Sequence, residues 1–289
     1  MSFASLLAGS DYRPSHEVRI GGELVEGRTY VPILSDDNTR IADQIRLAST
    51  LSEATGGELL IADPTTEYDV VDAAFVDDAA ATVDVVREHL EDRPPGDGGV
   101  LAGRKLERHV LNRTDNDDIA VMVLPGGGGC DGISTKRIQR IAGRAACNVV
   151  TINGRGSYRS FASLLLAIAN GPHSGVATDV AASIAAVEGT WVDVLHVIPP
   201  DLEPDLRAAA EERVERAAAR IDRPESVTTW LLEAEDPAAT IIDQSAYYGL
   251  TVIGAPQAGR LKRMVYGSTS QRIRERADSA VIAAKTARE

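Results

Sequence analysis

The chain has 289 residues, of which 44% are hydrophobic, and carries a formal net charge of −13 at pH 7. That charge argues against a nucleic-acid-binding protein, which needs a basic face for the phosphates, and against attachment to an anionic membrane surface. Only four of its thirty basic residues are lysines, and an acidic, lysine-poor surface is typical of a salt-adapted cytoplasm, where counterions screen the charge.

No sequence feature indicates export or a membrane span. The first ten residues lack the positive region of a signal peptide, and no segment reaches the roughly 18 uninterrupted apolar residues of a spanning helix. We therefore expect a cytoplasmic protein without direct membrane insertion. The two cysteines, Cys130 and Cys147, form no disulfide framework and lack metal-ligand spacing with the histidines, so we expect reduced thiols and no metal site.

Residues 1–28 read as an N-terminal extension, after which strand and helix patterns alternate. In chain order the patterns predict a strand at 31–34, a helix at 41–51, a strand at 57–63, a long helix at about 72–92, a strand at 118–125, a helix around 135–141 and a strand at 148–152. The segment 153–160 then reads as a linker.

The second half of the chain repeats this order. The patterns predict a strand at 165–169, a helix at 176–187, a strand at 189–198, a long helix at about 202–220, a strand at 249–254, a helix from 270 and a strand at 280–284. The offset between the two series is 134 residues, measured from Val31 to Leu165. A repeat of that length predicts tandem domains, placed at 29–155 and 156–289. Strands that alternate with helices predict a parallel, doubly wound sheet with helices on both faces.

Ligands of such sheets bind at the carboxyl ends of the strands, where the polar turns after Leu34, Ala169 and Ile253 fall. The turn after Ile253 runs from Gly254 to a Gly-Ser-Thr-Ser cluster at 267–270 that opens the last helix. Hydroxyls and free N–H groups at a helix N-terminus make an anion site. The alternative is a plain strand–loop–helix connection in which a serine or threonine caps the helix.

These features together resemble the universal stress protein family in its tandem form. The second half carries the resemblance through its whole length. Its loop is similar to the family's nucleotide motif, which is a glycine, two residues, a second glycine, nine residues, then glycine with serine or threonine. Gly254 fits the first position and Gly267-Ser268 the last, whereas Gln257 replaces the second glycine. With the acidic composition, the resemblance indicates a haloarchaeal member.

The resemblance implies two tandem Rossmann-like domains of the adenine nucleotide alpha hydrolase type. Each would be an α/β domain with a five-stranded, mainly parallel sheet and helices on both faces. The resemblance also implies pairing through the last strand, either in a homodimer or between the two domains of one chain. Some family members bind ATP or AMP, and Mg²⁺ is an optional companion of ATP.

Carried over residue by residue, the nucleotide site would comprise nine positions: Asn170, Val197, Ile253, Gly254, Gln257, Gly267, Ser268, Thr269 and Ser270. Asn170 replaces the family's aspartate after the first strand, and Val197 matches a position that lines the adenine. Arg260 or Lys262 would supply positive charge at the phosphates. Gln257 either blocks the approach of a phosphate or replaces the missing glycine contact.

The first half reads as a degenerate copy. Asp36 sits where the family has its aspartate, but the loop after Pro125 is about seven residues shorter than the motif, and Val123 replaces its first glycine. The glycine run at 127–132 also satisfies the dinucleotide fingerprint, yet Asn153 stands where an acidic residue would bind the ribose. We therefore expect no NAD site and a structural first half.

No pattern supports catalysis, since neither a Gly-x-Ser-x-Gly elbow nor a His-Glu-x-x-His helix occurs. His173 and Ser174 read as turn residues and His196 as a core residue of a strand; His109 and the pair Asp36-Asp37 have no partner beyond turn and cap roles. Two hypotheses stay open, and neither is an enzyme. One is a stress-response regulator that binds an adenine nucleotide in its second half and acts through partners. The other is a tandem scaffold without nucleotide, for example a regulatory subunit of a membrane transporter.

Overall fold

The computed structural model describes residue 24 and residues 27–35, 37–64, 68–73, 79–92, 104–126, 134–153, 161–255 and 269–287. The first half contains β1 (Arg28–Pro32), α2 (Asn38–Thr55), β2 (Leu59–Asp63), β3 (Tyr68–Ala73), α3 (Ala79–Glu91), α4 (Arg104–Asn116), β4 (Ile119–Pro125), α5 (Thr135–Arg144) and β5 (Asn148–Asn153). The second half contains β6 (Ser163–Ile168), α6 (Ser174–Glu188), β7 (Trp191–Ile198), α7 (Pro204–Ala218), η1 (Pro224–Ser226), β8 (Val227–Glu233), α8 (Pro237–Ser245), β9 (Leu250–Gly254), α9 (Thr269–Arg276) and β10 (Ala280–Lys285).

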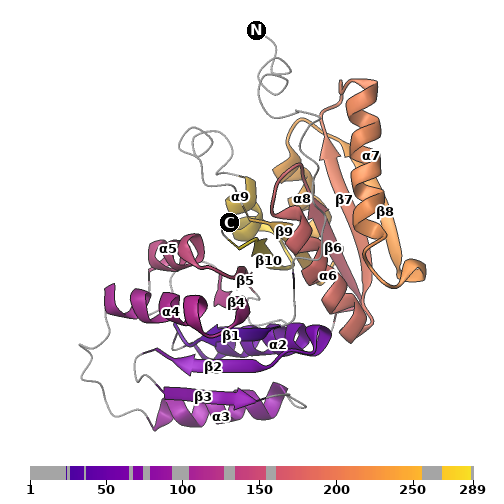
Figure 1. Ribbon diagram of the computed structural model, residues 1–289. Coiled ribbons are helices and arrows are strands. Elements are labelled where there is room, and N and C mark those ends of the chain that lie inside the picture. Colours follow the sequence, from indigo (N-terminus) through magenta and orange to yellow (C-terminus); the bar gives the residue numbers. More distant parts are fainter. Residues whose placement is uncertain are drawn as a thin grey trace.

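All ten strands belong to one sheet with the order β3-β2-β1-β4-β5-β10-β9-β6-β7-β8 (Figure 1). Each half supplies five neighbouring strands in the same relative order. Most pairs are parallel, because helices connect strands that lie side by side. The predicted α/β fold with a mainly parallel sheet is therefore confirmed.

The two halves meet edge to edge through their last strands. β5 and β10 pair antiparallel, from Asn153 opposite Val281 to Val149 opposite Lys285. On one face of this junction α2 packs against α6, and the hydroxyl of Thr50 donates to Glu188 Oε1 at 3.1 Å. The last-strand pairing expected from the resemblance thus occurs within one chain.

Helices cover both faces of the sheet, as predicted, but the two faces differ. One apolar core, under α2, α3, α6 and α7, runs through both halves without interruption. The opposite face holds two separate cores, one under α4 and α5 and the other under α8 and α9. The shared core ties the halves together on one side only.

Cys147 lies in the core under α4 and α5, where it is 4% exposed. Burial raises the pKa of its thiol to about 12, so it is an inert core residue, in line with the prediction. Cys130 lies outside the described residues. None of the helices in the described part of the chain combines the length and the apolar character of a membrane span.

The helix predicted at 72–92 is wrong at its start, because Tyr68–Ala73 form β3 and the helix begins only at Ala79. β3 runs antiparallel to β2. Only four residues join these strands, whereas a crossover to a parallel neighbour needs about a dozen. In the second half α7 provides that crossover, so β8 is parallel to β7.

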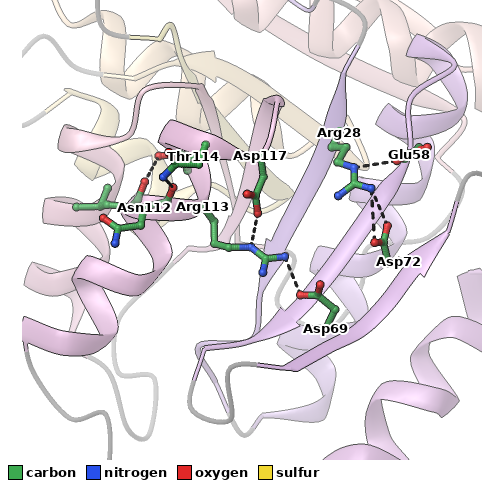
Figure 2. A network of polar contacts seen from close by, with 10 residues as sticks. Arg28, Glu58, Asp69, Asp72, Asn112, Arg113, Thr114 and Asp117 are labelled. Atoms are coloured by element: carbon green, nitrogen blue, oxygen red, sulfur yellow. Dashed lines mark hydrogen bonds and ion pairs between the residues drawn. The ribbon is translucent and has the colours of Figure 1, made fainter.

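Two arginines anchor the antiparallel edge strand β3 (Figure 2). Arg28 of β1 donates to Asp72 at 3.1 Å, and Arg113 of α4 donates to Asp69 at 2.7 Å. Arg113 also lies 2.5 Å from Asp117. These partly exposed ion pairs position the strand more than they stabilise it.

The constant offset of 134 residues between the halves is wrong by one residue in the first strand. Val31 faces the shared core, whereas Leu165 faces the core under α8 and α9. Successive side chains of a strand alternate between faces, so Val31 corresponds to Leu166. The register of β1 with β4 and the register of β6 with β9 are both consistent with this alignment. On this alignment Ser35, rather than Asp36, corresponds to Asn170.

The two tryptophans of the chain both lie in the second half. Trp191 of β7 is 55% exposed and Trp230 of β8 is 48% exposed. Asp193, two residues after Trp191 on β7, accepts a hydrogen bond of 2.5 Å from the Tyr248 hydroxyl. β8 is the edge strand at this end of the sheet.

Candidate functional site

In each half, two neighbouring parallel strands send their following helices to opposite faces of the sheet. β6 and β9 pair in parallel, but α6 packs into the shared core and α9 into the core of the other face. β1 and β4 do the same with α2 and α5. Such a switch point, at the carboxyl ends of the strands, is where ligands bind in open α/β sheets.

The predicted site residues that the structure describes lie at the switch point of the second half. Asn170 is exposed and lies just after β6, and Gly254 ends the neighbouring strand β9. Thr269 and Ser270 are the first two residues of α9, as the hydroxyl cluster predicts. The positions Gln257, Gly267 and Ser268 lie outside the described residues, as do Arg260 and Lys262.

The two apolar site positions differ in burial. Ile253 is 3% exposed in the core under α8 and α9, so its side chain stabilises the sheet and leaves its backbone groups for a ligand. Val197 packs against the same core but is only half-buried.

Gly254 allows the end of β9 to lie against the loop between β6 and α6. A Cβ at this position would lie 3.2 Å from the carbonyl carbon and oxygen of His173. The next N–H, of Ala255, donates to the carbonyl of Ala284 at 2.7 Å. The first glycine of the motif thus has a packing role here that the sequence analysis did not foresee.

In the first half, a side chain of the chain itself caps the corresponding helix α2. Asp37 caps α2 by accepting from the N–H groups of Thr39 and Arg40, at 2.9 and 3.3 Å. Ser35 is 3% exposed, and its hydroxyl accepts from the N–H of Asp37. A carboxylate at a helix N-terminus takes the place of an anionic ligand group. Asp36 lies outside the described residues.

In the second half the first helix has no such cap. His173 occupies the N-cap position of α6, and its side chain makes no capping hydrogen bond. Thus, among the described residues, no carboxylate caps the N-terminus of α6 in the second half, whereas Asp37 caps α2 in the first.

His173 instead bonds the C-terminal segment. Its Nδ1 accepts from the N–H of Thr286 at 3.3 Å, and the Thr286 hydroxyl donates to the carbonyl of Pro172 at 3.1 Å. The N–H of Ala287 donates to Oδ1 of Asn148 on β5 at 2.8 Å. Residues near the C-terminus therefore connect the loop after β6 to the first half, and no local sequence pattern indicates this contact.

His173 is neutral at pH 7. Burial lowers its pKa to about 4, and the positive charge of Lys285 adds to the effect. Lys285 ends β10 at the same edge of the sheet and places a cation beside the site. Lys285 was not predicted as a site residue, although its place at the end of a strand parallel to β9 is a usable signal.

The predictions for Ser174 and His196 agree with the structure, whereas His109 lies inside α4 and not in a turn or cap. The Ser174 hydroxyl donates to the carbonyl of Ala169 at 2.7 Å and so stabilises the turn. His196 is buried, and its Nδ1 lies 2.8 Å from the carbonyl oxygen of Ile168, as expected of a core residue. Burial lowers its pKa. Within the described ranges, no three histidine, cysteine or acidic side chains gather as metal ligands do.

The low pKa of His173 predicts a pH dependence of stability. The unfolded chain, with a histidine pKa of 6.5, takes up a proton before the folded chain, so this contribution is complete above pH 6.5 and is lost as the pH falls to about 4. We expect His173→Asn, whose Oδ1 can still accept from Thr286, to flatten the melting temperature profile between pH 4 and 6.5. Thermal melts of both proteins test this, and identical profiles would contradict it.

Among known protein families, one matches the second half of the chain. Residues 161–285 match the model of the universal stress protein family. The second half thus resembles the universal stress protein family, and this half contains the switch point at which α6 lacks a side-chain cap. No curated protein sequence matches the chain significantly.

Solved structures resemble the whole chain, both halves included. A universal stress protein from Archaeoglobus fulgidus DSM 4304 is 15% identical, with 91% of this chain and 98% of that one covered, at a TM-score of 0.52. A functionally unknown protein from Pseudomonas aeruginosa PAO1 is 16% identical, with 91% and 94% covered, at a TM-score of 0.56. Such identities establish the fold alone, which extends over both halves of the chain.

Proposed function

We propose that the second half is a universal stress protein domain that binds an adenine nucleotide, ATP or AMP, and that the protein acts as a stress-response regulator through partner proteins, without catalysis. The observation that carries the proposal is that the family match and the switch point at which α6 lacks a side-chain cap fall in the same half. The first half, in which Asp37 caps α2, then has a structural role. The acidic, lysine-poor composition supports a high-salt cytoplasm as the place of action.

In this proposal the groups at the edge of the sheet have separate roles. The exposed amide of Asn170 would bond the sugar or the base, and the hydroxyls of Ser268, Thr269 and Ser270 would bond phosphate at the start of α9. Lys285 would add positive charge beside the loop after β6. Mg²⁺ would reach the site with ATP, held by the phosphates.

The second candidate function is a tandem scaffold that binds no nucleotide, such as a regulatory subunit of a transporter. It is favoured by the amide at Asn170, which accepts with one oxygen where a carboxylate has two. Extraction of bound small molecules from freshly purified protein, followed by mass spectrometry, separates the two. Recovered ATP, ADP or AMP near one per chain supports the nucleotide proposal. An empty protein without a thermal shift in millimolar ATP favours the scaffold.

The role of Ser268 can be tested by repulsion. We expect Ser268→Asp to weaken ATP binding at least about tenfold, because a carboxylate would face the phosphates, and to leave the melting temperature unchanged. The matched control is Ser134→Asp, at the exposed N-cap of the corresponding helix α5. ATP titration by calorimetry measures both. Equal affinities of the two variants would remove Ser268 from the site.

A further inference from the structure

A hollow of ≈ 360 Å³ lies between α4 and α5 of the first half, away from the switch points. The side chains that line it are Glu107, Arg108, Leu111, Asn112, Asp115, Arg140 and Arg144. Three guanidinium groups thus surround one space in a chain of net charge −13. Like charges this close repel one another unless an anion lies between them.

The anion that the protein itself supplies is Glu107, which is 4% exposed. Its two carboxylate oxygens accept from Arg140 at 3.2 Å and from Arg144 at 2.8 Å. The arginine side chains remain 56% and 60% exposed, and each guanidinium has five N–H donors, so most donors stay available.

Arg108 lines the same hollow from α4 and is exposed. Within the described part of the chain it makes no hydrogen bond or ion pair. Asp115 offsets one of the positive charges, and the lining keeps a positive surplus.

The second half shows that the fold does not need the buried carboxylate. Thr114 and Ser245 occupy equivalent places, because each hydroxyl donates to a carbonyl three residues earlier and accepts the N–H that follows the next helix. Seven residues before them lie Glu107 and Ala238, both buried. A methyl group thus suffices where the first half buries a charge, which is unfavourable without compensation.

The arginines differ between the halves in the same way. Ile141 and Ile273 are equivalent, since each is buried and lies four residues before a buried alanine. The residues before them are Arg140 and Arg272. Arg272 pairs with Asp236 through two bonds of 3.1 and 2.9 Å, whereas Arg140 lines the hollow.

We propose that the hollow between α4 and α5 is a binding site for a small, multiply charged oxyanion. Arg108, Arg140 and Arg144 bind its phosphate or carboxylate groups, and the buried Glu107 holds two of these guanidiniums in place. Planar guanidinium groups recognise both kinds of oxyanion through paired N–H donors. The site is independent of the nucleotide site in the second half.

The test titrates inorganic pyrophosphate and citrate into the full chain carrying Ser268→Asp, with Arg108→Gln or Arg216→Gln added. Among the described residues the Arg108 side chain has no hydrogen-bond or ion-pair partner to lose, so its replacement should leave the fold intact. Arg216 is a matched control, 49% exposed and paired on α7 with Glu212. We expect Arg108→Gln to weaken binding of the preferred probe about 10–100-fold, and Arg216→Gln to leave it unchanged.

The choice of probe identifies the chemistry, because preference for pyrophosphate indicates a phosphorylated ligand and preference for citrate a polycarboxylate. The proposal is overturned if neither probe binds, or if Arg108→Gln weakens binding no more than Arg216→Gln. If the nucleotide proposal is wrong, Ser268→Asp changes nothing and the comparison of the two arginines still decides.

Discussion

The second half expressed alone, residues 156–289, is expected to form a homodimer through β10. In the full chain β10 is bonded on one side by β9 and on the other by β5, over Val281 to Lys285. Without the first half, this edge of the sheet and the surface of α6 that packs on α2 become exposed. Antiparallel pairing is compatible with a two-fold axis, so a second copy of β10 can replace β5.

Sedimentation velocity measures this outcome as twice the mass of the fragment, with dissociation on dilution. The matched variant is Ile282→Lys, at the centre of the pairing and 0% exposed, which should leave the fragment monomeric or unfolded. A wild-type fragment that is folded and monomeric at every concentration would show that the exposed edge and helix need no partner.

Replacement of Arg140 and Arg144 together by alanine is expected to destabilise the protein by about 3–5 kcal/mol. Both arginines compensate the carboxylate of Glu107, which is almost fully buried. Removal of both leaves a buried charge with neither of these partners. Urea unfolding of the full chain measures the change in the free energy of unfolding.

The control for this prediction is the triple variant that also carries Glu107→Ala. Alanine at this place reproduces Ala238 of the second half, so the triple variant should recover most of the lost stability. A double variant that loses less than about 1 kcal/mol would show that the carboxylate does not depend on its arginines for compensation.

Much of the fold follows from periodicity. β1, α2 and β2, with their counterparts β6, α6 and β7, have long apolar patterns of period two or 3.6, and all six occur. The signals for α4 and β8 were present but weaker. Leu106, Val110 and Leu111 have helical spacing, and the alternation in Val227–Glu233 is typical of an edge strand. β3 was missed because its valines also fit a helix, and only the short connection from β2 excludes one.

The site was predictable only in part. The hydroxyl cluster predicts a helix from 270, and α9 begins one residue earlier, at Thr269. The position of Asn170 next to β9 depends on the pairing of β6 with β9, which local sequence does not give. The bond from Thr286 to His173 joins residues 113 positions apart and has no local signature. The cap role of Asp37, by contrast, was predicted and is confirmed, because its carboxylate accepts from two backbone N–H groups of α2.

The positions of the tryptophans turn the chain's own fluorescence into a spectroscopic label for one half. Trp191 belongs to β7 and Trp230 to β8. Indole fluorescence therefore reports the environment of the second half and not that of the first. Far-ultraviolet circular dichroism averages over both. Superimposable unfolding curves from the two signals would mean that the core shared by α2 and α6 makes the tandem a single cooperative unit.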